Sequence, residues 1–136
     1  MEGNKNKYVV NNKNLLYPEL SFEINGILFD VFKQIGGGHL EKYYQKAVAL
    51  GLKNKNINFK EQYYVPLKYE NEIVGKYFLD FLIEDKIVIE LKRGQFVPAN
   101  IINQTKQYLV SLNLELALIA CFTHKGVFIK RIINQL

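Results

Sequence analysis

The sequence has few of the residues with which small proteins usually build a metal site or hold a fold together. Its single cysteine, Cys121, excludes an intrachain disulfide framework and fits a reducing cytoplasm. Neither histidine, His39 nor His124, has a second histidine or a cysteine at ligand spacing, which argues against a zinc site. No Gly-Lys-Ser/Thr follows the glycines at 36–38, so a P-loop is excluded and a turn that ends a helix is favoured.

Long hydrophobic runs are also missing. No stretch of the chain is long enough to span a bilayer, and residues 1–16 lack the apolar core of a signal peptide. We therefore expect a cytoplasmic protein without a membrane partner. Residues 1–14 are rich in Asn and Lys and are interpreted as a mobile tail, which leaves residues 15–136 as one domain.

What the chain does contain is apolar side chains and an excess of positive charge. Hydrophobic residues make up 49% of the 136 residues, which is enough for a packed core. The formal net charge of +5 suits a polyanionic partner such as nucleic acid, although many basic proteins bind none.

Hydrophobic periodicity predicts an α/β fold. Apolar residues recur every three or four positions after Ser21, which is placed to cap a first helix, and again from about His39 to Lys53, where Gly51 helps to close the second. The period then falls to two in three successive segments, before a helix that follows Pro98 and two further strands. The order ααβββαββ predicts a single domain with a central mixed sheet flanked by helices. The expected strands are 59–69, 73–83, 86–92, 115–122 and 126–133, and the third helix is 97–112.

The hairpin of residues 77–93 carries the most informative polar residues. Strict alternation would place Leu79 on one apolar face with Phe81 and Ile83, and Asp80 on the other. Glu90 and Lys92 share one face of the next strand. A turn with an odd number of residues, such as 84–86, sets Asp80 opposite Glu90 and avoids burying an unpaired carboxylate, so this register is favoured.

Two adjacent carboxylates repel each other unless a cation lies between them. Asp80 and Glu90, with the backbone carbonyl of Leu91, would supply the oxygen ligands that Mg²⁺ or Mn²⁺ prefers. Lys92 beside such a metal could orient or deprotonate a water and offset charge on a phosphate. The alternative is a solvated ion pair on an exposed sheet face, since a bare Glu-x-Lys spacing is common.

These residues resemble a known family. Asp80 followed after nine residues by Glu-Leu-Lys resembles the PD-(D/E)xK nuclease superfamily. The segment "GHLEKYY", with Gly38, Glu41 and Tyr44, resembles the signature of the GxxExxY proteins within it, and the resemblance extends over about residues 17–134. It implies a restriction-endonuclease-like core in which Glu41, Asp80, Glu90, Lys92 and Gln104 are catalytic. Glu41 would be a further metal ligand, and Gln104 the glutamine on the helix after the Glu-x-Lys strand.

Several of these residues also have ordinary structural explanations. An acid such as Glu41 in the first turn of a helix is stabilised by the helix dipole without any catalysis. Lys53 and Lys55 could follow a nucleic-acid backbone or form a plain solvated loop. Tyr44 and Tyr108 could stack on bases, but sheet propensity and core packing also account for the many tyrosines.

The sequence therefore predicts a divalent-metal-dependent nuclease that acts on DNA in preference to RNA. Two alternatives remain. One is a structure-selective endonuclease similar to the archaeal Holliday-junction resolvases, which would work as a homodimer. The other is a nucleic-acid-binding or protein-binding module that keeps the fold without catalysis.

Overall fold

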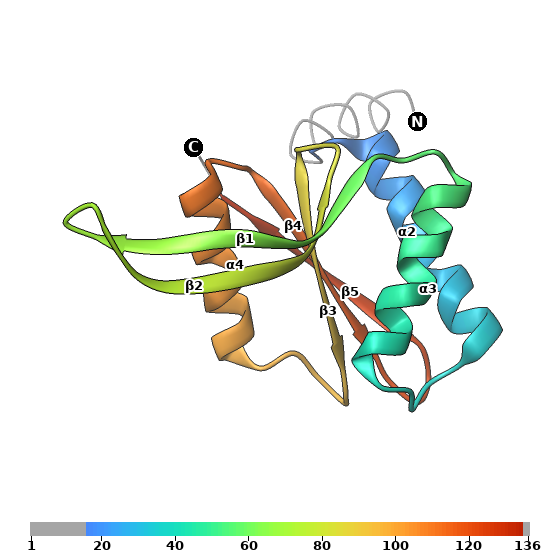
Figure 1. Cartoon of the computed structure of the whole chain (residues 1–136). Coiled ribbons are helices and arrows are strands. Elements are labelled where there is room, and N and C mark those ends of the chain that lie inside the picture. Colours follow the sequence, from blue (N-terminus) through green and yellow to red (C-terminus); the bar gives the residue numbers. More distant parts are fainter. Residues whose placement is uncertain (1–15, 135–136) are drawn as a thin grey trace, which may run out of the picture.

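The computed structural model describes residues 16–134, and the tail expected at residues 1–14 lies outside this range. Three helices and five strands follow one another in the predicted order, which confirms the ααβββαββ arrangement (Figure 1). Across these residues, the helices are all too short or too polar to cross a bilayer. The elements are α2 (Pro18–Ile35), α3 (Glu41–Asn54), β1 (Phe59–Tyr69), β2 (Glu72–Ile83), β3 (Ile87–Arg93), α4 (Ala99–Leu112), β4 (Leu116–Phe122) and β5 (Val127–Ile133).

The five strands form one mixed sheet in the order β1-β2-β3-β4-β5. Only β3 and β4 are parallel, and helix α4 connects them as a crossover. All seven residues of β4 are buried, as are the first five of β3, because helices cover both faces of the sheet at its centre. The carboxyl ends of β3 and β4 therefore lie side by side at one edge, where residues 93 and 122 are paired.

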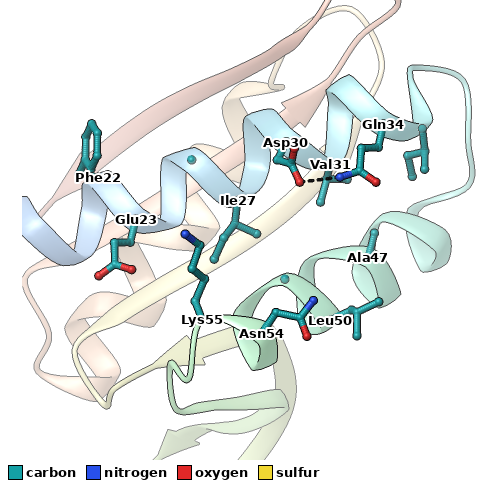
Figure 2. Close-up of a pocket in the computed structure, with 13 residues that line it drawn as sticks. Phe22, Glu23, Ile27, Asp30, Val31, Gln34, Ala47, Leu50, Asn54 and Lys55 are labelled. Atoms are coloured by element: carbon teal, nitrogen blue, oxygen red, sulfur yellow. Dashed lines mark hydrogen bonds between the residues drawn. The ribbon is translucent and has the colours of Figure 1, made fainter.

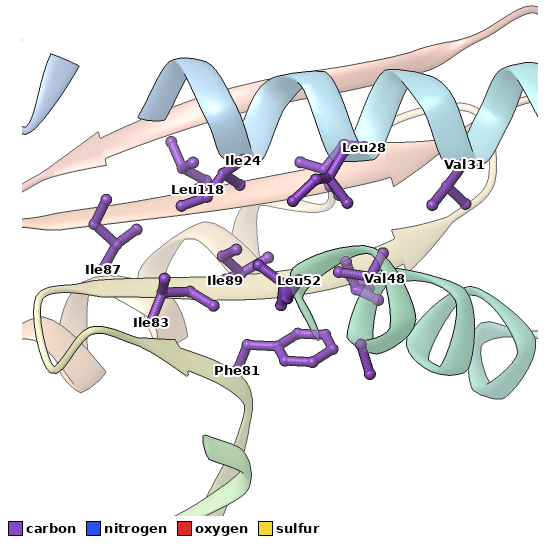
Figure 3. Packing of buried hydrophobic residues seen from close by; sticks show 14 of the residues in the cluster. Ile24, Leu28, Val31, Val48, Leu52, Phe81, Ile83, Ile87, Ile89 and Leu118 are labelled. Carbon is purple, nitrogen blue, oxygen red and sulfur yellow. The ribbon is translucent and has the colours of Figure 1, made fainter. Parts of the chain in front are cut away.

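Each face of the sheet has its own hydrophobic cluster. Helices α2 and α3 pack on one face, where Leu28 and Leu52 meet Phe81 and Ile89 (Figure 3). Helix α4 packs on the other face, where Leu109 meets residues such as Ile119. The sheet is thus the middle layer of three, and burial of these apolar side chains holds the layers together.

Two helix boundaries differ from the sequence-based expectation. Helix α2 begins at Pro18 rather than after Ser21, because proline is favoured in the first turn; Ser21 is buried, and its hydroxyl lies 3.4 Å from the Leu16 carbonyl. Gly51 does not end α3 but lies within it. A Cβ at Gly51 would come within 2.6 Å of the Ile27 side chain, so glycine is needed for the close approach of α2 and α3.

The expected alternation along β2 is wrong at one point. Leu79 does not share a face with Phe81; it packs on the α4 side, in the cluster that also contains Leu82. The change of face falls at Asp80. Gln62 lies opposite it, between the pairs Glu61–Phe81 and Tyr63–Leu79. Gln62 has φ of +48°, a left-handed conformation that strict strand geometry does not allow. The hairpin therefore twists sharply at the Asp80–Gln62 position.

Beyond this twist, β1 and β2 leave the rest of the sheet. Strand β3 pairs with β2 only through Phe81, Leu82 and Ile83, whereas β1 and β2 stay paired to Tyr69 and Glu72. The two strands project as an arm from the body of the molecule (Figure 1). Asp80 thus lies where β2 separates from β3, and its side chain is free to occupy the opening.

Candidate active site

Asp80 and Glu90 are joined by a hydrogen bond at the point where the β2–β3 ladder ends. Ile83 pairs with Ile87 across a three-residue turn, so the odd register predicted from the sequence is correct. The backbone N–H of Asp80 donates to Glu90 Oε2 at 3.0 Å, and the backbone N–H of Leu91 donates to Asp80 Oδ2 at 2.7 Å. Each carboxylate is therefore fixed by a main-chain donor of the opposite strand.

The Asp80 carboxylate replaces a carbonyl of the ladder. In a continued register, Leu91 would pair with Leu79, and the Leu91 N–H would bond to the main chain of β2. The N–H and C=O of a residue in a strand point to the same side, so the Leu91 carbonyl also faces the opening between the strands. Two carboxylates and this carbonyl are thereby directed to one place.

Glu90 is buried, with 7% of its surface exposed. Burial, followed by the neighbouring charge of Asp80, raises its pKa from 4.5 to about 8. Burial also raises the pKa of Asp80, against the lowering effect of its hydrogen bond from Leu91. The alternative of a solvated ion pair on an exposed sheet face is therefore wrong, because α4 covers this face and the carboxyls are held in a poorly solvated place.

Lys92 lies one alternation beyond Glu90 on the same face of β3. Its positive charge lowers the pKa of both Asp80 and Glu90, although other effects dominate. Within residues 16–134 the only salt bridge joins Lys60 to Asp85, so the Lys92 ammonium is near the carboxylates without being paired to either. It is half-buried and available to another anion.

Helix α3 directs its amino-terminal end to the two carboxyls. Gln45 Nε2 donates to the Asp80 carbonyl at 3.1 Å and also lies 3.1 Å from Glu61 Oε2, which ties the helix to the twisted hairpin. Glu41 is one turn earlier on the same helix face. Its negative charge is a minor contribution to the raised pKa of both Asp80 and Glu90. The role of Glu41 stays a prediction.

Helix α4 forms the opposite wall of the site. Tyr108 is 5% exposed and packs edge-on against Tyr77, with ring centroids 5.6 Å apart. Burial, and then the nearby charge of Glu90, raises its pKa. Gln104 is one turn before Tyr108 and so is on the same helix face. Its role in the site stays a prediction. Tyr108 itself presents almost no surface on which a base could stack.

Other sequence-derived candidates lie elsewhere. Tyr44 has no exposed surface; its ring stacks on Phe122 at 4.0 Å, and its hydroxyl donates to the Gly36 carbonyl at 2.7 Å. The expected nucleic-acid contact at Tyr44 is therefore wrong, and its role is structural. Lys53 is in the last turn of α3 and Lys55 follows it, about 20 Å from Glu41 along the helix axis. The structure does not bring these lysines to the site.

Sequence reasoning missed two residues that hold Asp80 in place. Gln45 could have been found from its position four residues after Glu41, since a helix places both on one face. Gln62, whose Nε2 lies 3.4 Å from Asp80 Oδ1, could have been found from the hairpin register. Neither carries a sequence signal by itself, because isolated glutamines are common on helix and strand surfaces.

The donor set suits a hard divalent cation. Each of the two carboxylates has one oxygen fixed by a backbone N–H. The second oxygen of Glu90 remains for a ligand, and the second oxygen of Asp80 has only the long 3.4 Å contact from Gln62. Burial of two like charges is costly, and a cation between them would remove that cost. In residues 16–134, no three His, Cys, Asp or Glu side chains are grouped closely enough to hold a metal, so Glu41 does not complete a three-acid set. Asp80, Glu90 and the Leu91 carbonyl are the ligands that fit.

The metal-free protein is expected to become less stable as the pH rises from about 4.5 to about 8. Glu90 binds its proton more tightly in the folded chain, where its pKa is about 8, than in the unfolded chain, where it is near 4.5. Its contribution to stability is thus complete below pH 4.5 and is lost as the pH passes through 8. Thermal unfolding in EDTA from pH 5 to 8.5 measures this. If the variant Glu90→Gln showed the same decline as wild type, Glu90 would not be its source.

Comparison with known proteins gives a family and a fold. The family model of the PD-(D/E)XK nuclease superfamily matches residues 18–132. The crystal structure of SSO0001 is similar over 71% of this chain and 50% of that chain, with a TM-score of 0.54 and 17% identity. An alkaline exonuclease, LHK-Exo from Laribacter hongkongensis, is similar over 70% of this chain and 56% of that chain, with a TM-score of 0.50 and 16% identity. The chain thus spans about half the length of these two proteins, and at such identities the likeness shows the fold alone. A search of curated proteins finds no match.

Proposed function

The chain belongs to the PD-(D/E)XK nuclease superfamily, and on that basis we propose that it is a divalent-metal-dependent nuclease that hydrolyses phosphodiester bonds in DNA. The observation that carries the proposal is the buried pair Asp80 and Glu90, fixed by main-chain donors where the sheet opens. A module that only bound nucleic acid would gain nothing from two carboxylates beside a phosphate, since like charges repel.

The roles of the residues follow from their positions. Asp80, Glu90 and the Leu91 carbonyl would hold Mg²⁺ or Mn²⁺, which would supply a Lewis acid for the phosphate and a more acidic water. Lys92 orients the attacking water and offsets the charge that develops on the phosphate oxygens. Glu41 and Gln104 border the site from α3 and α4, where they orient water or substrate. The water attacks phosphorus in line, and a new P–O bond forms as the water gives up a proton to solvent. The opposite P–O bond breaks, and the leaving oxygen takes a proton from solvent.

We also assign the chain to the GxxExxY proteins within the superfamily. Two positions of the motif, Gly38 and Tyr44, have a shared structural role. Gly38 has φ of +86°, a conformation that disfavours other residues, and Tyr44 bonds to the Gly36 carbonyl and accepts from the His39 N–H at 3.3 Å. These contacts fix the loop before α3. They determine where that helix begins, and so where Glu41 lies.

The proposal predicts metal-dependent cleavage of DNA. Single-stranded, duplex and branched DNA, with RNA beside them, should be incubated with Mg²⁺, Mn²⁺ or EDTA. Cleavage is expected with either metal and should be absent in EDTA, because without a cation the two carboxylates repel the phosphate. Products are measured by denaturing gel electrophoresis.

The matched control is Glu90→Gln, which keeps the acceptor for the Asp80 N–H but removes a charge. Cleavage that persisted in EDTA, or in this variant, would contradict the proposal. Selective cutting of branched DNA would favour the resolvase-like alternative. Tight binding of nucleic acid without cleavage under any condition would favour the binding module.

A further inference from the structure

A groove lies at the carboxyl ends of β3 and β4. It consists of a cavity of about 290 Å³ and an adjoining cavity of about 460 Å³ that shares Gln95, Thr123 and His124 with it. Arg93, the last residue of β3, lines the first cavity, and Lys125 lines the second. We refer to the two cavities together as the Arg93 groove. No role in the site described above accounts for it.

The charge of the Arg93 groove has one sign. Within residues 16–134 its lining includes Arg93, Lys125 and His124 but no Asp or Glu. The cavity of about 550 Å³ between α2 and α3 is different, since Glu23 and Asp30 line it beside apolar side chains (Figure 2). Of these surfaces, the Arg93 groove is the one whose chemistry suits an anion.

The walls of the groove are held by close main-chain packing. A Cβ at Gly37 would come within 2.5 Å of the Thr123 carbonyl, so the loop before α3 lies directly against the β4–β5 turn. Gly94 has φ of +129°, a conformation that favours glycine, and so allows the chain to turn after β3. Arg93 Nη1 donates to the His39 carbonyl at 3.1 Å. One bond positions the guanidinium, and its other N–H donors remain for a ligand.

The groove is next to the proposed reaction site. Arg93 follows Lys92 in β3, so their Cα atoms are about 3.8 Å apart, and their side chains lie on opposite faces of the strand. The two side chains therefore diverge from the same strand end. A strand with one phosphate at Lys92 meets the groove if it continues past the carboxyl end of β3.

We propose that the Arg93 groove binds a second phosphate group of the substrate strand, adjacent to the phosphate that is cleaved. A guanidinium presents paired donors that match two phosphate oxygens, and Lys125 and His124 add donors from the β4–β5 turn. This assignment rests on the proposed nuclease function. It makes Arg93 a binding residue that determines where the strand lies, rather than a residue that acts on the reacting atoms.

Binding of inorganic phosphate to the metal-free protein tests the groove without any catalysis. In a titration followed by ¹H–¹⁵N NMR, the amides of Gly38, Gly94 and Thr123 are expected to shift. Arg93→Gln should weaken phosphate binding by about 10-fold or more, the loss expected for a charge-assisted contact. His124→Gln should weaken phosphate binding to a smaller extent, and it leaves the hydrogen bond from Arg93 to the His39 carbonyl intact. The control Lys86→Gln removes one positive charge at the opposite end of β3 and should leave the affinity unchanged.

Oligonucleotides with and without a 5′-phosphate then identify the source of the phosphate. If the groove holds a terminal phosphate, wild type should prefer the phosphorylated strand, and Arg93→Gln should abolish that preference. If it holds an internal phosphate, Arg93→Gln should raise KM for both strands to the same extent with little change in kcat. Both results support the groove.

The proposal is overturned if phosphate shifts none of these amides, or if Lys86→Gln weakens binding as much as Arg93→Gln and His124→Gln do. Arg93→Lys, which keeps the charge, and the melting temperature of each variant separate lost binding from lost folding. A wild-type protein that binds phosphate in the groove but cleaves no nucleic acid would remove the nuclease function and leave the anion site intact.

Discussion

Replacement of Lys92 by alanine is expected to lower cleavage by about 10²-fold or more, with little effect on nucleic-acid binding. Lys92 lies near Asp80 and Glu90 but forms no salt bridge within the described residues, so its ammonium is available to the substrate. Its contribution arises in the transition state, where negative charge grows on the phosphate and a water loses its proton. One phosphate contact among several is a small part of binding. Single-turnover cleavage and equilibrium binding, measured on the same DNA, give the two effects separately.

The variant Lys92→Arg distinguishes a nuclease from a binding module. Arginine keeps the charge but remains protonated and has a different shape, so it should not restore cleavage. In a binding module, arginine would replace lysine without loss and there would be no activity to lose. Lys92 is half-buried, and the melting temperatures of both variants show whether the fold has survived. Full recovery of cleavage in Lys92→Arg would show that positive charge alone is sufficient at this position and would contradict the role of Lys92 in orienting the water.

The variant Glu90→Gln is expected to lose cleavage by about 10²-fold to 10³-fold and to become more stable in the absence of metal. Loss of activity follows from loss of one of two carboxylate ligands. The gain in stability follows from burial, because Glu90 is 7% exposed and its pKa is raised to about 8 beside Asp80. A glutamine can still accept from the Asp80 N–H, so the variant removes the charge and keeps the hydrogen bond. We expect a gain of about 1–3 kcal/mol at pH 8 in EDTA, or several degrees in Tm.

In the presence of metal, wild type should become more stable than the Glu90→Gln variant. Mg²⁺ or Mn²⁺ binds the folded protein and so raises the Tm of wild type, whereas the variant should respond much less. Differential scanning calorimetry of both proteins, in EDTA and in excess metal, gives the four melting temperatures to compare. The control Glu84→Gln changes an acid in the turn between β2 and β3, away from Asp80, and should behave as wild type. A Glu90→Gln protein that was less stable than wild type in EDTA, or was stabilised equally by metal, would show that Glu90 is not a destabilised metal ligand.

Local patterns in the sequence determined the elements and the pairing of the acids. Periods of two and of three to four residues identified each strand and helix in order, since these periods follow from backbone geometry alone. The register of the hairpin also followed from local reasoning. An unpaired carboxylate on the core side is costly, so the turn at residues 84–86 had to hold an odd number of residues, and Asp80 had to come opposite Glu90.

Only the tertiary structure decided what surrounds these acids. The twist at Asp80 and Gln62 moved Leu79 to the α4 side, because β2 leaves β3 there and alternation holds only within a continuous strand. Packing of α4 on the sheet buried Glu90. Packing of α3 on the sheet brought Gln45 to Asp80, although the two residues are 35 positions apart along the chain. The Arg93 groove likewise needs three loops to meet. Sequence periodicity describes one element at a time, whereas burial, charge and pKa depend on which elements pack together.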